Sequence, residues 1–312
     1  MAIRVTQSML NSQLLRNVSG NLNKMNNLQN QLSTGKKINA PSDDPVGLTF
    51  AMRYRNELSS NDQYIRNVDS ALSFIEYTDT ALGQIGDVVQ RARELMVQGS
   101  TTQPDTAYSA IKLELGELYN QLTEVGNSKF NGKYAFNGEQ TTTEPYPKLG
   151  VDDNSTAAKA YQVTTDSGQL KLELSPSMTL AVNVPGNEIF GEAVTPANEA
   201  DSNNLFYVLK QACDALEGGR PEEVSALLGK LDSRMNTILE KRSEIGARMN
   251  RVELIQGRLG DIDQNLTELQ SKTEDADLAY VITNLQMEEN VYQASLSTGA
   301  RLIQPSLIDF LR

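Results

Sequence analysis

Residues 33–45 read Ser-Thr-Gly-Lys-Lys-Ile-Asn-Ala-Pro-Ser-Asp-Asp-Pro, and this stretch divides the helical pattern of the chain. Gly35 is typical of a helix stop, and each proline pushes the residue before it, Ala40 or Asp44, away from the α region. Asp44 followed by Pro45 is typical of an N-cap with proline at the first helical position. The stretch therefore predicts a helix end at Gly35, about ten extended residues, and a second helix from Pro45.

The segment before this break predicts an amphipathic helix. Residues 1–42 contain basic residues and no acid, and their apolar residues are spaced three and four apart, as on one helical face. A basic, Ser-rich start is also typical of an organelle transit peptide, but a packing helix is favoured because the last helix carries a matching stripe. The two stripes are Leu10, Leu14, Val18, Leu22, Met25, Leu28 and Leu32, and Leu278, Ile282, Leu285, Tyr292 and Leu296.

Two much longer helical patterns lie inside these end segments. Apolar residues recur every seven positions, which is typical of a coiled-coil-like seam. Asp79, Gly86 and Arg93 interrupt the second seam position, so a bundle is favoured over a two-stranded coil. The sequence Ser-Lys-Thr-Glu at 271–274 predicts a capping box that opens the last helix. The main seam positions are Val68, Ile75, Leu82, Val89 and Met96, then Leu231, Ile238, Ile245, Val252, Leu259 and Leu266.

Between about residues 127 and 200 the pattern becomes strand-like. Asn131-Gly132 and Asn137-Gly138 are turn signals, and residues 170–174 and 178–184 alternate between apolar and polar. The predicted fold class is therefore mainly α, a long coiled-coil-like helical bundle formed by the N- and C-terminal halves with a small β-rich insertion. The predicted divisions are terminal helices at 1–42 and 272–312, a bundle at 43–130 and 200–271, and an insertion at 131–199.

Composition excludes several kinds of chemistry. The chain has no His and a single Cys, Cys213, which excludes a Ser-His-Asp triad, a Cys-His pair and a His-ligated metal. Adjacent Asp43 and Asp44 are interpreted as capping residues, and the Thr-Gly-Lys-Lys run lacks the spacing of a phosphate loop. The sequence therefore predicts no catalytic, cofactor or metal residues and no enzyme activity.

Charge and hydropathy bear on partners. A net charge of −12, without basic residues interleaved with aromatics, argues against nucleic-acid binding. No apolar run is long enough to span a bilayer, and the basic start lacks the aromatics that anchor a helix at a membrane surface. The narrow apolar stripes of the terminal segments bury too little surface to offset the entropy of ordering them. We therefore expect these ends to be disordered in a monomer and to fold against neighbouring copies.

Several motifs at both ends resemble the bacterial flagellin family. They are Leu-Ser-Thr-Gly-Lys-Lys-Ile-Asn at 32–39 with Asp43-Asp44, Asp-Ala-Asp-Leu-Ala at 275–279, Gln-Ala-Ser-Leu at 293–296, and Pro-Ser-Leu-Ile-Asp-Phe-Leu at 305–311. The resemblance covers about residues 1–140 and 200–312. Within the family, the proline-flanked Ser42-Asp43-Asp44 is similar to members at the hook–filament junction. The predicted junction motif is Gly35, Pro41, Ser42, Asp43, Asp44 and Pro45.

The resemblance implies a structural adaptor of the flagellum that links another hook-associated protein to flagellin. It implies an extracellular location, reached through the type III export apparatus without a cleaved signal, and an export chaperone that binds the C-terminal segment. It also implies that the terminal helices form an inner tube of self-associated copies. The two stripes of residues 10–32 and 278–296 are therefore the predicted assembly interface.

Three alternatives stay open from the sequence. A short flagellin that builds the filament itself belongs to the same family and differs mainly in the opening stretch, at residues 33–45. A coiled-coil signalling or sensor bundle would need a linked membrane span or output domain. An enzyme with its site in the insertion would need a catalytic constellation, and the sequence shows none.

Overall fold

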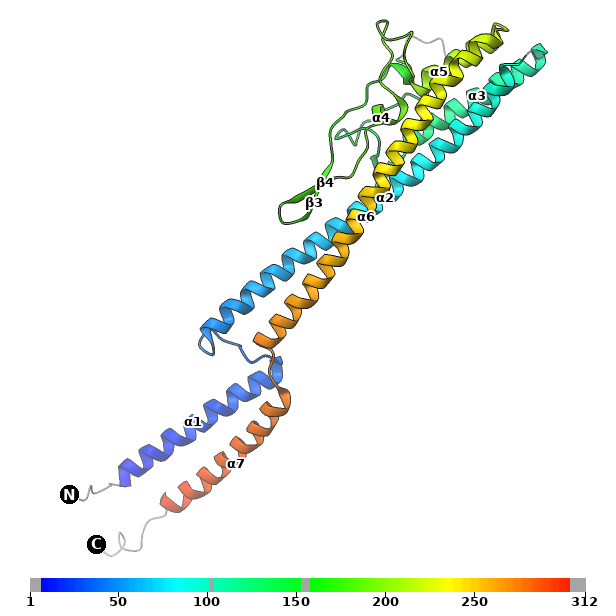
Figure 1. Ribbon diagram of the computed structural model, residues 1–312. Helices are drawn as coiled ribbons and strands as arrows, with labels where there is room; N and C mark the ends of the chain where they lie inside the picture. The colour runs from blue at the N-terminus through cyan, green and yellow to red at the C-terminus, as the bar shows by residue number, and fades with distance from the viewer. Residues whose placement is uncertain (1–6, 102–103, 153–157, 304–312) are drawn as a thin grey trace, which may run out of the picture. The chain divides into compact units, whose positions relative to one another are not determined.

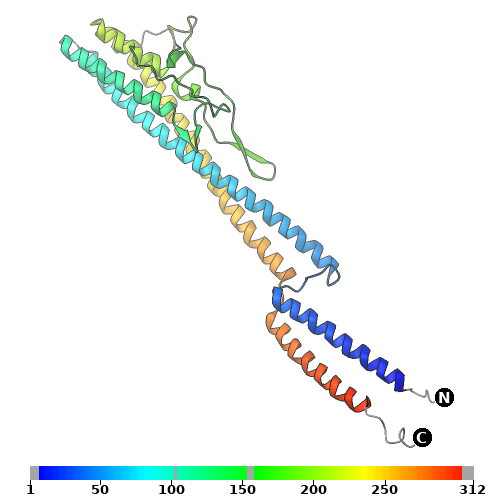
Figure 2. The same ribbon diagram turned by 180° about the vertical axis from the view of Figure 1, so that it is seen from behind.

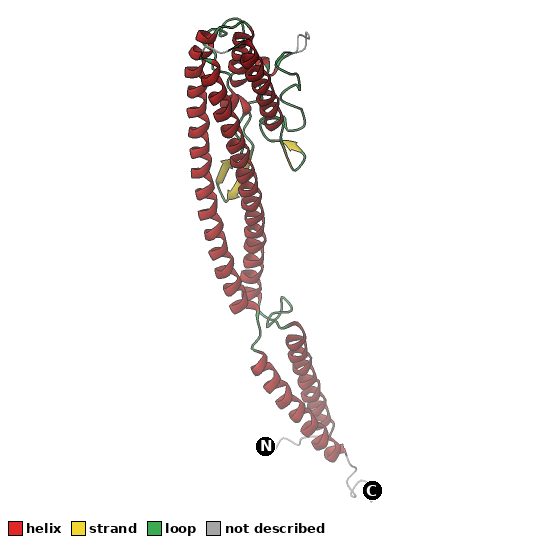
Figure 3. Cartoon of the chain, turned by 90° about the vertical axis from the view of Figure 1, so that its right-hand side faces the viewer, coloured by secondary structure: helices red, strands yellow, loops and turns green. Residues whose placement is uncertain are grey.

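The computed structural model describes residues 7–101, 104–152 and 158–303, and helices dominate them (Figure 3). The strands form two small antiparallel sheets. The predicted fold class, mainly α with a small β insertion, is confirmed. The helices are α1 (Gln7–Thr34), α2 (Pro45–Gly99), α3 (Asp105–Gly126), α4 (Gly186–Phe190), α5 (Leu205–Glu217), α6 (Pro221–Glu274) and α7 (Leu278–Ile303). The strands are β1 (Lys129–Phe130), β2 (Lys133–Tyr134), β3 (Lys171–Ser175) and β4 (Met178–Ala181), with a 3-10 turn, η1, at Ala160–Gln162.

Described residues of the chain form two compact units. One unit takes its residues from 1–60 and 262–312, and the other from 61–261. Helices α2 and α6 contribute residues to both units. The three-part division predicted from the sequence stays a prediction.

The core of the 61–261 unit is a seam between α2 and α6, which run side by side there (Figures 1 and 2). The predicted seven-residue repeat is confirmed as far as Leu259, because its positions up to there are almost fully buried, whereas the last predicted position, Leu266, is only half-buried. Seven residues make almost two full helical turns, so side chains at these positions all point toward the facing helix. These buried positions are Val68, Ile75, Leu82, Val89 and Met96 of α2, and Leu231, Ile238, Ile245, Val252 and Leu259 of α6.

Charged pairs flank this seam where the apolar repeat is interrupted. Arg242 of α6 donates two hydrogen bonds to the Asp79 carboxylate, at 3.1 and 3.2 Å. Arg93 of α2 makes a similar pair with Asp232, at 2.6 and 3.4 Å. Polar residues at the second seam position therefore join the two helices by ion pairs on the rim.

An aromatic cluster joins α3 and α5 to the insertion. Phe206 of α5 lies at its centre, with ring centroids 5.1 Å from Phe190, 5.0 Å from Tyr146 and 5.4 Å from Tyr119. Gly186 permits this packing, because a Cβ there would lie 2.4 Å from the Tyr146 hydroxyl. Four aromatic rings therefore form one buried cluster in this unit.

The two sheets are hairpins. Strand β1 pairs with β2 through a turn at Asn131 and Gly132, both with positive φ, as the Asn-Gly signal predicts. Strand β3 pairs with β4, with Leu172 opposite Leu180. Strand β4 ends at Ala181, earlier than the predicted residue 184, because residues 182–185 lead into α4 and the Asn183 carboxamide bonds to the chain at Leu170 and Gly168.

In the other unit, α1 and α7 lie side by side as an antiparallel pair (Figure 1). Lys24 of the basic helix pairs with Glu288 of the acidic one at 3.3 Å. The helices approach closely near Gly299, where a Cβ would lie 2.6 Å from a methyl carbon of Leu14. Side chains of opposite charge therefore face each other across this interface.

Candidate functional site

Residues 33–45, between the first two helices, fold as a compact loop. Helix α1 ends at Thr34, and Gly35 takes the left-handed conformation with φ of 70° and donates its N–H to the Gln31 carbonyl, as predicted. Helix α2 begins at Pro45. The Asp44 side chain caps it by accepting hydrogen bonds from the N–H groups of Val46 and Gly47, at 3.1 and 2.9 Å.

The prediction of about ten extended residues is wrong, because a second carboxylate folds the loop. The Asp43 side chain accepts hydrogen bonds from the N–H groups of Asn39 and Ala40, at 3.0 and 2.8 Å. The Asp43 N–H in turn donates to the Ala40 carbonyl at 3.0 Å. Pro41 and Ser42 lie exposed at the tip of the resulting turn. The adjacent aspartates therefore have separate capping roles rather than one shared site.

Ile38 anchors this loop, although it belongs to neither the predicted apolar stripes nor the predicted junction motif. It is only 4% exposed, the lowest value between residues 9 and 50. A Cβ at Gly47 would lie 2.7 Å from the Ile38 Cδ1 atom, so the first turn of α2 packs directly on it. The signal was present in the sequence, since Ile38 is the one large apolar residue within 33–45.

The second connection, between α6 and α7, corrects the predicted capping box. Helix α6 continues through Ser271 and ends at Glu274, and α7 begins at Leu278. The cap of α7 is Asp277, whose side chain accepts a hydrogen bond from the Tyr280 N–H at 3.1 Å. The Ser-Lys-Thr-Glu sequence has the spacing of a capping box, but α6 stays helical through it, so the cap of the next helix falls to Asp277.

The two connections meet at Glu274. Its carboxylate accepts hydrogen bonds from Arg55 of α2 at 2.6 Å and from the Lys36 ammonium of the loop at 2.8 Å. Burial by itself favours the protonated acid, but the hydrogen bonds from Arg55 and Lys36 outweigh it and hold the pKa of Glu274 below its ordinary value. The Glu274 side chain, which is 1% exposed, is thus a charged group with partners on two other segments.

The predicted assembly residues divide into two sets. One set faces the space between α1 and α7 and is half-buried, and the other stays exposed on the pair. The half-buried set is Leu14, Val18, Met25, Leu28, Leu285 and Tyr292. The exposed set is Leu10, Leu22, Leu32, Leu278, Ile282 and Leu296. Their predicted role in contacts between copies stays a prediction, and the motif at 305–311 lies outside the described residues.

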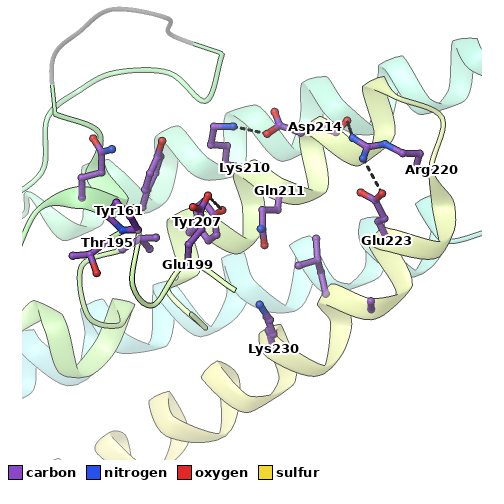
Figure 4. A pocket seen from close by; sticks show the side chains of 15 residues that line it. Tyr161, Thr195, Glu199, Tyr207, Lys210, Gln211, Asp214, Arg220, Glu223 and Lys230 are labelled. Atoms are coloured by element: carbon purple, nitrogen blue, oxygen red, sulfur yellow. Dashed lines mark hydrogen bonds and ion pairs between the residues drawn. The ribbon is translucent and has the colours of Figure 1, made fainter. Parts of the chain in front are cut away.

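A cavity of about 600 Å³ lies in the other unit, between α5, α6 and the loop before α5 (Figure 4). Its charged side chains already have partners within the chain. Glu199 accepts a hydrogen bond from the Tyr207 hydroxyl and Lys230 donates one to the Ala200 carbonyl, both at 2.6 Å. Lys210 pairs with Asp214, and Arg220 pairs with Glu223 at 2.7 Å. A charged ligand would have to separate these pairs in order to enter, so the arrangement favours a structural role.

Described residues outside these clusters show no sign of a metal or redox centre. Among them, no group of three or more Cys, Asp and Glu residues is placed to hold a metal ion. Burial raises the pKa of the Cys213 thiol to about 12, so the thiol is protonated and unreactive at neutral pH. No helix in the described ranges is long and apolar enough to cross a bilayer.

Comparisons with known proteins place these features in a family. The model of the bacterial flagellin N-terminal helical region matches residues 5–141, and that of the C-terminal helical region matches residues 228–311. The chain belongs to the bacterial flagellin family. The matched ranges contain α1, α2, α3, α7 and most of α6, so both connections at Glu274 lie in family segments, whereas most of the insertion does not.

Individual members of the flagellin family match along nearly the whole chain. Flagellar hook-associated protein 3 of Escherichia coli is 26% identical over 310 residues, covering 94% of this chain and 95% of that protein. The flagellin of Bacillus subtilis is 25% identical over 316 residues, covering 97% of each. The crystal structure of flagellar hook associated protein-3 from Legionella pneumophila has a TM-score of 0.61 at 16% identity, covering 71% of this chain and 98% of that one. This likeness shows a shared fold.

Proposed function

We propose that this member of the flagellin family is the structural adaptor at the junction between hook and filament. The observation that carries the proposal is the near-full-length likeness to hook-associated protein 3. Family membership assigns the chain to structural flagellar proteins, so the signalling-bundle alternative is set aside.

The geometry of the loop between α1 and α2 supports this proposal. A subunit between two different tubular assemblies must hold its terminal helices in a defined relation to the chain segments that follow them. Pro45 fixes the backbone at the first position of α2, and the Asp43 and Asp44 carboxylates take up four N–H groups of the loop. These contacts fix the turns of the 35–45 loop, and we propose that the loop sets the junction geometry.

The exposed apolar residues of α1 and α7 are the proposed contacts between copies of this chain in a ring. On one side of the ring lies the other hook-associated protein, and on the other lie the first flagellin subunits. The protein reaches this place through the flagellar type III apparatus without a cleaved signal, and an export chaperone holds its C-terminal segment beforehand. An absence of disulfides within the chain, which has one Cys, suits passage of an unfolded chain.

The rival within the family is a short flagellin, which the near-full-length match to the Bacillus subtilis flagellin favours. Self-polymerisation separates the two. Purified full-length protein is incubated at high concentration with short fragments of flagellar filament as seeds. It is then imaged by negative-stain electron microscopy beside a flagellin control treated in the same way. The adaptor stays as subunits or short oligomers while the control grows long filaments. Long filaments of the protein alone would establish the flagellin alternative instead.

A further inference from the structure

The two chain connections of the 1–60 and 262–312 unit are fastened to each other at one point. The loop after α1 and the connection after α6 form an isolated antiparallel bridge between Lys36 and Asp275. The Lys37 N–H donates to the Glu274 carbonyl at 2.6 Å, and the Ala276 N–H donates to the Gly35 carbonyl at 2.9 Å. The segment that follows α1 and the segment that leads into α7 therefore share a pair of backbone hydrogen bonds.

The Glu274 side chain adds charged contacts to this bridge. It joins the loop through Lys36 and the third turn of α2 through Arg55, so one carboxylate on α6 contacts two other segments. Its two partners differ from it in burial. Lys36 and Arg55 are 38% and 46% exposed, whereas Glu274 is 1% exposed. The cations keep part of their hydration, but the carboxylate has exchanged water for these two partners and depends on them.

The segments on the two sides of this point differ in how well they are packed. Beyond it, α1 and α7 form a two-helix pair with half of its predicted apolar positions exposed. Inside it, Ile38, Ala51 and Glu274 are almost fully buried. Fraying that starts at the ends of a thin helix pair spreads inward until it meets contacts that cost more to break.

We propose that Glu274, with Lys36, Arg55 and the two backbone hydrogen bonds, is a clamp at which this fraying stops. With the clamp closed, residues 36–58 and 262–276 stay folded in a free subunit whether or not α1 and α7 are paired. Assembly then orders two helices from a fixed starting point instead of reforming the whole joint. The clamp is a conformational device of the subunit and does not depend on the junction assignment.

The test compares backbone amide exchange in full-length free subunits by mass spectrometry at neutral pH. Glu274→Gln keeps the shape of the side chain and removes its charge. Glu268→Gln is the matched control, because Glu268 lies on the same helix and also pairs with a lysine, Lys272, but is exposed. In E274Q, exchange in residues 36–58 and 262–276 should accelerate about tenfold or more, the size expected for charged hydrogen bonds. In E268Q it should stay at the wild-type rate.

Two results would overturn the proposal. One is an E274Q exchange rate in those segments equal to that of E268Q. The other is an equal acceleration throughout residues 61–261, which would show a global loss of folding in place of a local clamp. A milder variant, Lys36→Gln, removes one arm only. It should accelerate exchange in the wild-type background and have almost no effect in the E274Q background, because the two changes disrupt one contact network. Equal effects in both backgrounds would also contradict the clamp.

Discussion

The side-chain amide of Asn61 donates a 3.1 Å hydrogen bond to the main-chain carbonyl of Leu259, inside the seam between α2 and α6. Asn61 is 4% exposed, so this polar group has given up water for one partner on the facing helix. This hydrogen bond is a polar contact within a long apolar repeat. A polar residue in such a seam favours one register of the two helices over others, because other registers would leave it without a partner.

The seam predicts that alanine substitutions at two leucines of α6 differ greatly in how much they lower the free energy of unfolding. Leu259 is 2% exposed and Leu254 is 76% exposed. Leu259→Ala should lower the free energy of unfolding by about 2–5 kcal/mol, because it leaves a cavity in the core. Leu254→Ala should change it by about 0.5 kcal/mol or less. Urea unfolding followed by far-UV circular dichroism measures both, and similar losses for the two variants would contradict the seam.

The cap of α2 predicts a graded effect at Asp44. Asp44→Ala removes the acceptor for the Val46 and Gly47 N–H groups and should cost about 1 kcal/mol, whereas Asp44→Asn keeps a good cap and should cost much less. Amide exchange of Val46 and Gly47, resolved by NMR, reads the local free energy. If Asp44→Asn were as damaging as Asp44→Ala, the carboxylate charge rather than the capping contact would carry the effect.

Acid should reduce the stability that the Glu274 contacts contribute. The pKa of Glu274 in the folded protein lies below its ordinary value of 4.5. A carboxyl group whose pKa is lowered by folding stabilises the protein fully at pH values above its pKa in the unfolded chain. This stabilisation is lost as the pH falls through its pKa in the folded protein. The stability difference between wild type and Glu274→Gln should therefore be constant near neutral pH and shrink below about 4.5. Urea unfolding at a series of pH values measures it, and a difference that grew in acid would contradict the assignment.

The terminal pair should be only weakly ordered in a free subunit. Half of the predicted apolar positions of α1 and α7 are exposed, so the helix pair by itself offsets little of the entropy of ordering. In dilute subunits, α1 and α7 should be readily cleaved by protease and fast in amide exchange, while the 61–261 seam is protected. The control is the same protein in an assembled state, which should protect both helices. Strong protection at low concentration would show that the pair folds without neighbours.

Local rules explain why much of this architecture was predictable. Val68, Ile75 and Leu82 recur every seven residues, and this spacing alone predicts a buried helix face. Gly35 ends one helix because it adopts a positive φ, and Asp44 begins the next because its side chain caps the free N–H groups. The clamp was not predictable in this way. Arg55 and Glu274 are 219 residues apart in the sequence, and nothing near either of them specifies the partner.

The remaining differences also have physical causes. The extended loop was a wrong prediction because proline restricts only its neighbours, whereas Asp43 folds the turn through contacts three and four residues away. The aromatic cluster around Phe206 was missed because it gathers rings from segments that periodicity treats separately. The assembly role of α1 and α7 concerns neighbouring copies, which the fold of a single chain does not include.

The central claim is that this chain joins hook to filament, and removal of its gene tests that claim most directly. Flagella of the deletion strain are examined by electron microscopy, and the culture medium is assayed for flagellin, with a strain carrying the restored gene as the control. The proposal predicts hooks without filaments and flagellin released into the medium, both reversed by the restored gene. Normal filaments in the deletion strain, or an absence of filament protein from both cell surface and medium, would contradict it.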